Sequence, residues 1–190
     1  MKKSIILFTL LLGYLANAQV STQNNDSGKF QLGVGYAFQI QSKSYTIFKN
    51  PPNVFINYQL KRWNSIDLSV GARVFLFMPR PENKDNFSTP WGFNPNVSSS
   101  YSFLDNKFRA YLALGYYFDQ YQFTTTASLG SPSASSTIRD NGITFTPGIK
   151  YFVKSNLFLD INYMLLNIKT NVISDTSSKS LFCLGFGVAF

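Results

Sequence analysis

Apolar and polar or small residues alternate with a period of two through most of this chain. From Phe30 to Ile40 every second residue is large and apolar, and the residues between them are Gln, Gly or Ala. Successive side chains of a β-strand point to opposite faces, whereas a helix repeats every 3.6 residues. The pattern therefore predicts strands and argues against a helical protein.

The alternation recurs in eight segments. The predicted strands cover residues 30–40, 54–60, 66–76, 95–103, 108–119, 143–151, 157–165 and 182–190. Long polar connections at 41–52, 79–90, about 124–140 and 167–178 alternate with short links near 61–65, 104–107 and 153–156. This layout is typical of outer-membrane barrels. We predict an all-β fold, an eight-stranded antiparallel up-and-down transmembrane β-barrel with four extracellular loops.

The distribution of charge between the two faces predicts which face meets lipid. The apolar faces of the eight segments carry no Asp, Glu, Lys or Arg. The opposite faces carry Asp67, Arg73, Arg109, Asp119, Lys150 and Asp160. A soluble sandwich or lipocalin-type barrel would place these charges outside with Gly, Ala and Ser, which is a poor soluble exterior. Lys or Arg facing lipid at mid-membrane costs about 2–4 kcal/mol. We therefore expect the six residues to form a polar network in the lumen.

The first 18 residues predict export. Lys2 and Lys3 precede an apolar run from residue 5 to 15, and Ala16-Asn17-Ala18 matches an A-x-A cleavage site. A transmembrane helix is the alternative, but it needs about 20 apolar residues. We predict a signal peptide at 1–18 cleaved after Ala18, a short periplasmic segment at 19–28, and the barrel at 29–190.

The last seven residues, Leu184–Phe190, resemble the terminal assembly signal of outer-membrane barrels. Gly185, Val188 and Phe190 match that motif, while Leu184 stands where a polar residue is usual. With the leader and the eight strands, the mature chain resembles the OmpA/OmpX-like outer-membrane β-barrel family over essentially its whole length. The resemblance implies a location in the bacterial outer membrane. It also implies recognition by the barrel-assembly machinery, with Phe190 as the key residue.

The residue types needed for catalysis or metal binding are scarce. The chain has no His and one Cys, and no P-loop or Ser/His/Asp set can be assembled. The lipid-modifying relatives implied by the resemblance rely on a catalytic His. We therefore predict no catalytic residues, no metal and no cofactor, and do not expect an enzyme. The net charge of +8, or +6 without Lys2 and Lys3, comes from scattered residues, so no nucleic-acid partner is expected.

An eight-stranded barrel has an interior that side chains can just fill. The inward aromatic side chains are predicted to be Phe55, Phe75, Tyr111, Tyr117 and Phe158. We therefore expect a plugged lumen, with Lys150 paired to Asp160 across a hairpin and Arg73 more loosely to Asp119. Pro95 and Pro147 lie inside predicted strands, where each removes a backbone donor. We expect bulges or strand ends at both prolines.

Two functions fit these features. The first is a structural or interaction role, in which the outward loops contact outer-membrane lipids and lipopolysaccharide, host surfaces or partner proteins. The loop cations that could meet lipid phosphates are Lys43, Lys49, Arg80, Lys84 and Arg139. The second is a narrow channel or transporter for small solutes. The sequence does not identify an extracellular partner.

Overall fold

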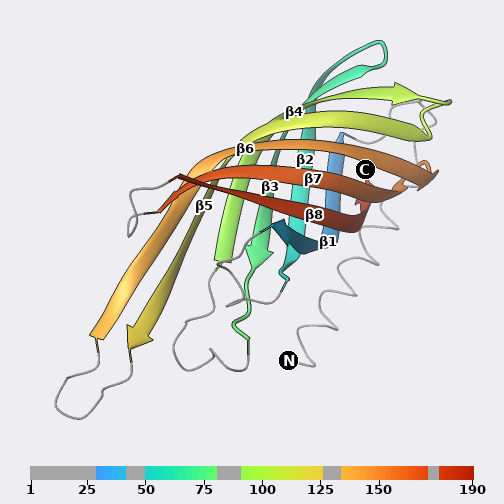
Figure 1. Cartoon of the computed structure of the whole chain (residues 1–190). Helices are drawn as coiled ribbons and strands as arrows, with labels where there is room; N and C mark the ends of the chain where they lie inside the picture. Colours follow the sequence, from blue (N-terminus) through green and yellow to red (C-terminus); the bar gives the residue numbers. More distant parts are fainter. Residues whose placement is uncertain (1–28, 42–49, 81–90, 126–133, 171–175) are drawn as a thin grey trace.

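The computed structural model describes residues 29–41, 50–80, 91–125, 134–170 and 176–190. Eight strands form one closed antiparallel barrel, in which each strand pairs with the next and β8 pairs with β1 (Figure 1). The strands are β1 (Phe30–Gln41), β2 (Pro52–Trp63), β3 (Ile66–Leu76), β4 (Trp91–Phe103), β5 (Phe108–Thr125), β6 (Ala134–Lys154), β7 (Leu157–Thr170) and β8 (Thr176–Ala189). The predicted fold class is confirmed.

The apolar faces predicted for the strands lie on the outside of the barrel, and the charged side chains of the opposite faces lie in its lumen. Leu114 on β5 is 61% exposed and Ile143 on β6 is 66% exposed. By contrast, Arg73 is 7% exposed and Asp160 only 1%. Closure pairs the backbone groups of all eight strands, which a lipid environment requires because it offers no other hydrogen-bond partners. The predicted arrangement of the two faces is therefore confirmed.

The two ends of the barrel differ. At the turn end, short links join β2 to β3, β4 to β5 and β6 to β7. Asn64 and Asn106 in two of these links adopt positive φ angles of 53° and 62°, a conformation that Asn tolerates. Phe190 also lies at this end and exchanges two backbone hydrogen bonds with Phe30. We call the opposite end, where the longer connections lie, the loop end.

Several strands are longer than the alternation predicts. β5 and β6 pair continuously as far as Thr125 and Ala134, so much of the predicted loop at 124–140 is strand (Figure 1). β7 and β8 likewise extend into the predicted connection at 167–178. The extensions of β6 and β8 are rich in Ser and Thr. Those of β5 and β7 alternate, but their apolar residues Tyr121, Leu166 and Ile168 are buried in the lumen, on the opposite face from the lipid-facing apolar residues. Backbone pairing with the neighbouring strand extends all four strands. A search for one continuous apolar face misses them, because that face is lost in β6 and β8 and changes side in β5 and β7.

The expectation of bulges or strand ends at Pro95 and Pro147 is wrong. Both prolines lie within strands whose register is the same before and after them. Pro95 is paired on its β3 side, and Pro147 on its β5 side. Pairing is interrupted only on the other side of each proline. A missing N–H weakens the ladder toward one neighbour only, so the strand continues.

Irregular register occurs instead near the strand ends, at Gln59/Lys61, Phe152/Lys154 and Gln39/Gln41. The first two irregularities adjoin the turn end. Each of these two bulges adds one residue to its strand. The residues between the bulge and the turn therefore change face: those that strict alternation would place outside lie inside, and the reverse.

Residues 1–28 lie outside the described residues. The signal peptide, its cleavage at Ala16 and Ala18, and the segment 19–28 therefore stay predictions. No helix long and apolar enough to cross a membrane occurs in the described ranges.

Candidate functional site in the lumen

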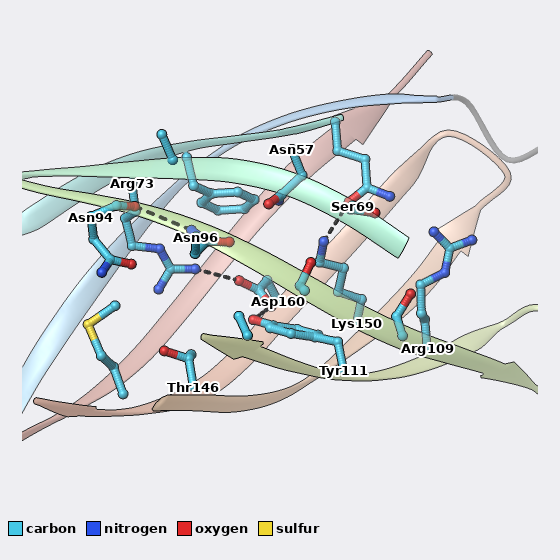
Figure 2. A pocket seen from close by; sticks show the side chains of 17 residues that line it. Asn57, Ser69, Arg73, Asn94, Asn96, Arg109, Tyr111, Thr146, Lys150 and Asp160 are labelled. Atoms are coloured by element: carbon cyan, nitrogen blue, oxygen red, sulfur yellow. Dashed lines mark hydrogen bonds and ion pairs between the residues drawn. The ribbon is translucent and has the colours of Figure 1, made fainter. Parts of the chain in front are cut away.

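The centre of the lumen holds an ionic network around Asp160. The Arg73 guanidinium, from β3, donates to Asp160 Oδ2 at 3.1 Å and to Asn162 Oδ1 at 3.0 Å. Figure 2 shows Arg73 directed across the lumen at Asp160, which lies on β7. The two residues are 87 positions apart in sequence. Closure of the barrel brings them together.

Two further donors complete the surroundings of the Asp160 carboxylate. Tyr111 donates its hydroxyl to Oδ1 at 2.8 Å, and Asn162 donates to Oδ2 at 2.9 Å. Tyr111 lies directly opposite Gly148 on β6. A Cβ atom at Gly148 would lie 2.4 Å from the Tyr111 ring, so only glycine leaves room for the ring. The sequence therefore supplies both the tyrosine and the gap in which it lies.

Lys150 does not bind Asp160 as predicted. The two residues are directly opposite in the β6–β7 register, but Lys150 Nζ donates to Gln31 Oε1 on β1. Its ammonium group also lies 5.2 Å from the Tyr111 ring centroid and 5.1 Å from that of Phe158. Such cation–π contacts offset part of the cost of burying a charge. Asp160 forms its ion pair with Arg73 instead.

A second ionic group lies toward the turn end, around Asp67. Arg109 Nη1 is 3.3 Å from Asp67 Oδ2, and Arg109 also donates to Ser102. Arg62 binds the same carboxylate with two nitrogens, at 2.6 and 3.1 Å. Sequence reasoning missed Arg62, because strict alternation from Tyr58 and Leu60 places it on the lipid face. The bulge at Gln59/Lys61 turns it inward, opposite Asp67.

Asp119 lies in a third group, nearer the loop end. It accepts the Tyr117 hydroxyl at 2.6 Å, and it is directly opposite Asp140 in the β5–β6 register. Lys179 forms an ion pair of 3.0 Å with Asp140. The predicted pairing of Arg73 with Asp119 is therefore wrong. Sequence reasoning missed Asp140 and Lys179: Asp140 was placed in a loop, and Lys179 precedes the start predicted for the last strand.

Most of the side chains in the loop-side half of the lumen are apolar. Phe75 is 0% exposed and Tyr117 is 2% exposed, and their rings pack edge to face with centroids 6.1 Å apart. The buried cluster consists of Ala37, Phe75, Phe77, Tyr117, Tyr121, Met164, Leu166, Ile168, Leu181 and Cys183. We call it the loop-side cluster. Sequence reasoning predicted the two aromatic residues at its centre, but missed Met164, Leu166 and Ile168.

A small cavity remains beside the central network. Its lining includes Arg73, Arg109, Lys150 and Asp160. Its volume is about 30 Å³, enough for roughly two waters. No group of three or more Cys, Asp or Glu able to share a metal ion occurs among the described residues. The cavity can hold water between charged groups but is too small for an organic ligand.

The three residues of the predicted assembly signal lie on β8 and just beyond it. Gly185 lies on the lumen side, opposite Gly35 on β1 and Asp160 on β7. Val188 pairs with Leu32. The ring of Phe190 lies 5.9 Å from the ring of Phe30. Their role in assembly stays a prediction.

Comparison with known proteins identifies the family. The family model described as outer membrane protein beta-barrel domain matches residues 7–190. No curated protein sequence matches the chain significantly. The solved structures similar to it are small outer-membrane barrels, and at such low sequence identity the likeness concerns the fold.

The attachment invasion locus protein Ail of Yersinia pestis is 16% identical, with a TM-score of 0.57, and the match covers 86% of this chain and 99% of Ail. Neisserial surface protein A is 17% identical, with a TM-score of 0.53 and coverage of 87% and 98%. The N-terminal β-barrel domain of Pseudomonas aeruginosa OprF is 13% identical, with a TM-score of 0.52 and coverage of 85% and 96%. The match to the family model, over nearly the whole chain, shows that this protein belongs to the outer membrane protein beta-barrel domain family and is a bacterial outer-membrane protein.

Proposed function

We propose that the protein acts as a structural or interaction barrel, with a lumen closed by side chains and the four connections of the loop end presented to the outside of the cell. One observation carries this proposal: Phe75 and Tyr117, at the centre of the loop-side cluster, are almost completely buried. The Arg73–Asp160 ion pair spans the lumen next to them. A solute would have to displace both the apolar packing and a buried ion pair to pass.

Single-channel recording on purified protein in planar bilayers tests the closed lumen. We expect no steady conductance from the parent protein. The variant Phe75→Ala/Tyr117→Ala should show brief openings, because it removes two large side chains from the cluster. The matched control Tyr116→Ala removes an outward side chain of β5 and should stay silent. Steady conductance of the parent would instead establish the alternative, a narrow channel or transporter for small solutes.

We also propose that the loop end contacts lipopolysaccharide phosphates. Arg80 and Arg139 are exposed there, whereas Lys43, Lys49 and Lys84 lie outside the described residues. Arg139 lies on β6 rather than in a loop, and it donates to Gln120 on β5. We expect Arg80→Gln/Arg139→Gln to weaken binding of purified lipopolysaccharide in a co-sedimentation assay. Unchanged binding would leave the proposal without support from these cations.

The proposed assembly signal needs a test that separates recognition from stability. Phe190 closes the barrel through its backbone, so Phe190→Ala keeps both hydrogen bonds to Phe30. We expect this variant to fold into pure lipid vesicles as fast as the parent protein. In vesicles that contain the barrel-assembly machinery, it should fold more slowly than the parent. Equal slowing in both would assign Phe190 a purely structural role.

A further inference from the structure

Two lysines near the turn end face outward only because of β-bulges. On β2, strict alternation after Tyr58 would turn Lys61 into the lumen. The register shift between Gln59 and Lys61 places Lys61 opposite the outward residue Leu68 instead. On β6, the shift between Phe152 and Lys154 places Lys154 opposite Leu157 in the same way. Bulges commonly re-aim individual side chains, and here two of them move a lysine to the outer surface.

The two lysines lie on β2 and β6, four strands apart in a ring of eight and therefore on opposite sides of the barrel. Both are exposed, and neither forms an ion pair within the described ranges. Lys61 Nζ lies 4.9 Å from the centroid of the Trp63 ring. Lys154 lies three residues after the outward Tyr151 on β6, and the Tyr151 ring is 4.9 Å from that of Phe108. Lys61 therefore contacts an outward aromatic side chain, and Lys154 lies further along the strand that carries one. Such side chains favour the membrane–water interface.

Charge at the turn end is strongly one-sided. The exposed cations there are Lys29, Lys61, Lys107 and Lys154, and the exposed acid among the described residues is Asp105. Asp67, also near this end, is buried and neutralised by Arg62 and Arg109. An excess of exposed ammonium groups beside an aromatic belt is complementary to negatively charged lipid headgroups.

We propose that Lys61 and Lys154 bind the headgroups of anionic phospholipids around the turn end of the barrel. The aromatic neighbours lie at the interface between hydrocarbon and headgroups, and each flexible lysine stem extends from there to a phosphate. The bulges set the position of both lysines. This proposal does not depend on whether the lumen conducts or on what the loops bind.

Tryptophan quenching by brominated lipids tests Lys61 directly. The chain has two tryptophans, so Trp91→Phe leaves Trp63 as the reporter beside Lys61. The protein is folded into phosphatidylcholine vesicles containing either brominated phosphatidylglycerol or brominated phosphatidylcholine at equal mole fraction. We expect Trp63 to show an apparent preference of about three- to fivefold for phosphatidylglycerol at low salt. The preference should shrink in concentrated salt, which screens charges.

Variants separate charge from structure. Lys61→Gln should reduce the preference to about one, and Lys61→Arg should retain it. Lys169→Gln removes an exposed lysine near the loop end of β7 and should leave the preference unchanged. For Lys154, Tyr151→Trp in a background of Trp63→Phe and Trp91→Phe supplies the reporter. An absence of preference in the parent, or a preference that persists in Lys61→Gln, overturns the proposal. An equal loss of quenching by both lipids would show a structural change and overturn it too.

Discussion

The two halves of the lumen are occupied by side chains of different chemistry. The loop-side half is packed mainly with apolar side chains such as Phe75 and Met164, much like the core of a soluble protein, and holds the ion pair Lys179–Asp140. From the centre to the turn end, buried charges lie beside a smaller apolar cluster that includes Phe55 and Phe158. Asp160 binds one guanidinium group there, and Asp67 binds two. An inward position in a small barrel therefore does not require a polar residue, provided that the space is filled.

The difference has an energetic consequence. In the apolar half, stability depends on volume, so a substitution that keeps volume is tolerated and a truncation leaves a cavity. In the ionic half, stability depends on each charge keeping its partner, so removal of one partner is costly even where little volume is lost. The following four substitutions separate these two rules.

The largest loss is expected for Asp160→Ala. It leaves Arg73 buried without its carboxylate partner, which costs about 3–5 kcal/mol. Urea-induced unfolding in detergent micelles, followed by heat-modifiable gel mobility and tryptophan fluorescence, measures the loss. Asp105→Asn removes an exposed carboxylate from a turn and should change stability by less than about 0.5 kcal/mol. Similar values for the two variants would show that the buried pair contributes little.

Met164→Ala should be next. Met164 is buried in the loop-side cluster, and truncation of such a residue costs about 2–5 kcal/mol through lost burial and the cavity left behind. Met164→Leu nearly conserves volume and should cost less than about 1.5 kcal/mol in the same unfolding assay. If both variants were equally unstable, the loop-side half would not behave as a packed core.

Arg62→Gln should have a smaller effect, of about 1.5 kcal/mol. Its side chain is 22% exposed, and Asp67 keeps Arg109 as a partner when Arg62 is lost. The neighbouring Lys61→Gln removes an outward charge and should leave the free energy of unfolding within about 0.5 kcal/mol of the parent. A loss as large as that of Asp160→Ala would mean that Arg62 is the main partner of Asp67.

Lys150→Met should have the smallest effect, within about 1 kcal/mol of the parent. Lys150 contacts Gln31 and two aromatic rings, and Asp160 retains Arg73 when the lysine is replaced. Met has a similar length, and its burial carries no desolvation penalty for charge. A destabilisation of several kcal/mol in urea unfolding would show that the ammonium group is essential to the network.

Local alternation predicted most of the strands and the contents of the lumen. Arg73, Arg109, Lys150 and Asp160 all face inward, as expected from their phase relative to Val74, Ala110, Ile149 and Ile161. The same reasoning failed where the phase changes. Arg62, Lys61 and Lys154 follow bulges, and no residue type in the sequence marks those bulges. The end of β5 was missed because its apolar residue Tyr121 faces the lumen rather than the lipid, and the start of β6 because it carries no alternating signal.

The sequence by itself determined that this chain forms strands, that there are eight, and that charged side chains face away from lipid, because a strand alternates its faces residue by residue. Only the tertiary structure decided which charges meet. The partner of Asp160 is Arg73, on the far side of a closed barrel, rather than Lys150 opposite it on the neighbouring strand. Contacts across the lumen depend on the combined register of all eight strands and on side-chain length, and a local pattern encodes neither.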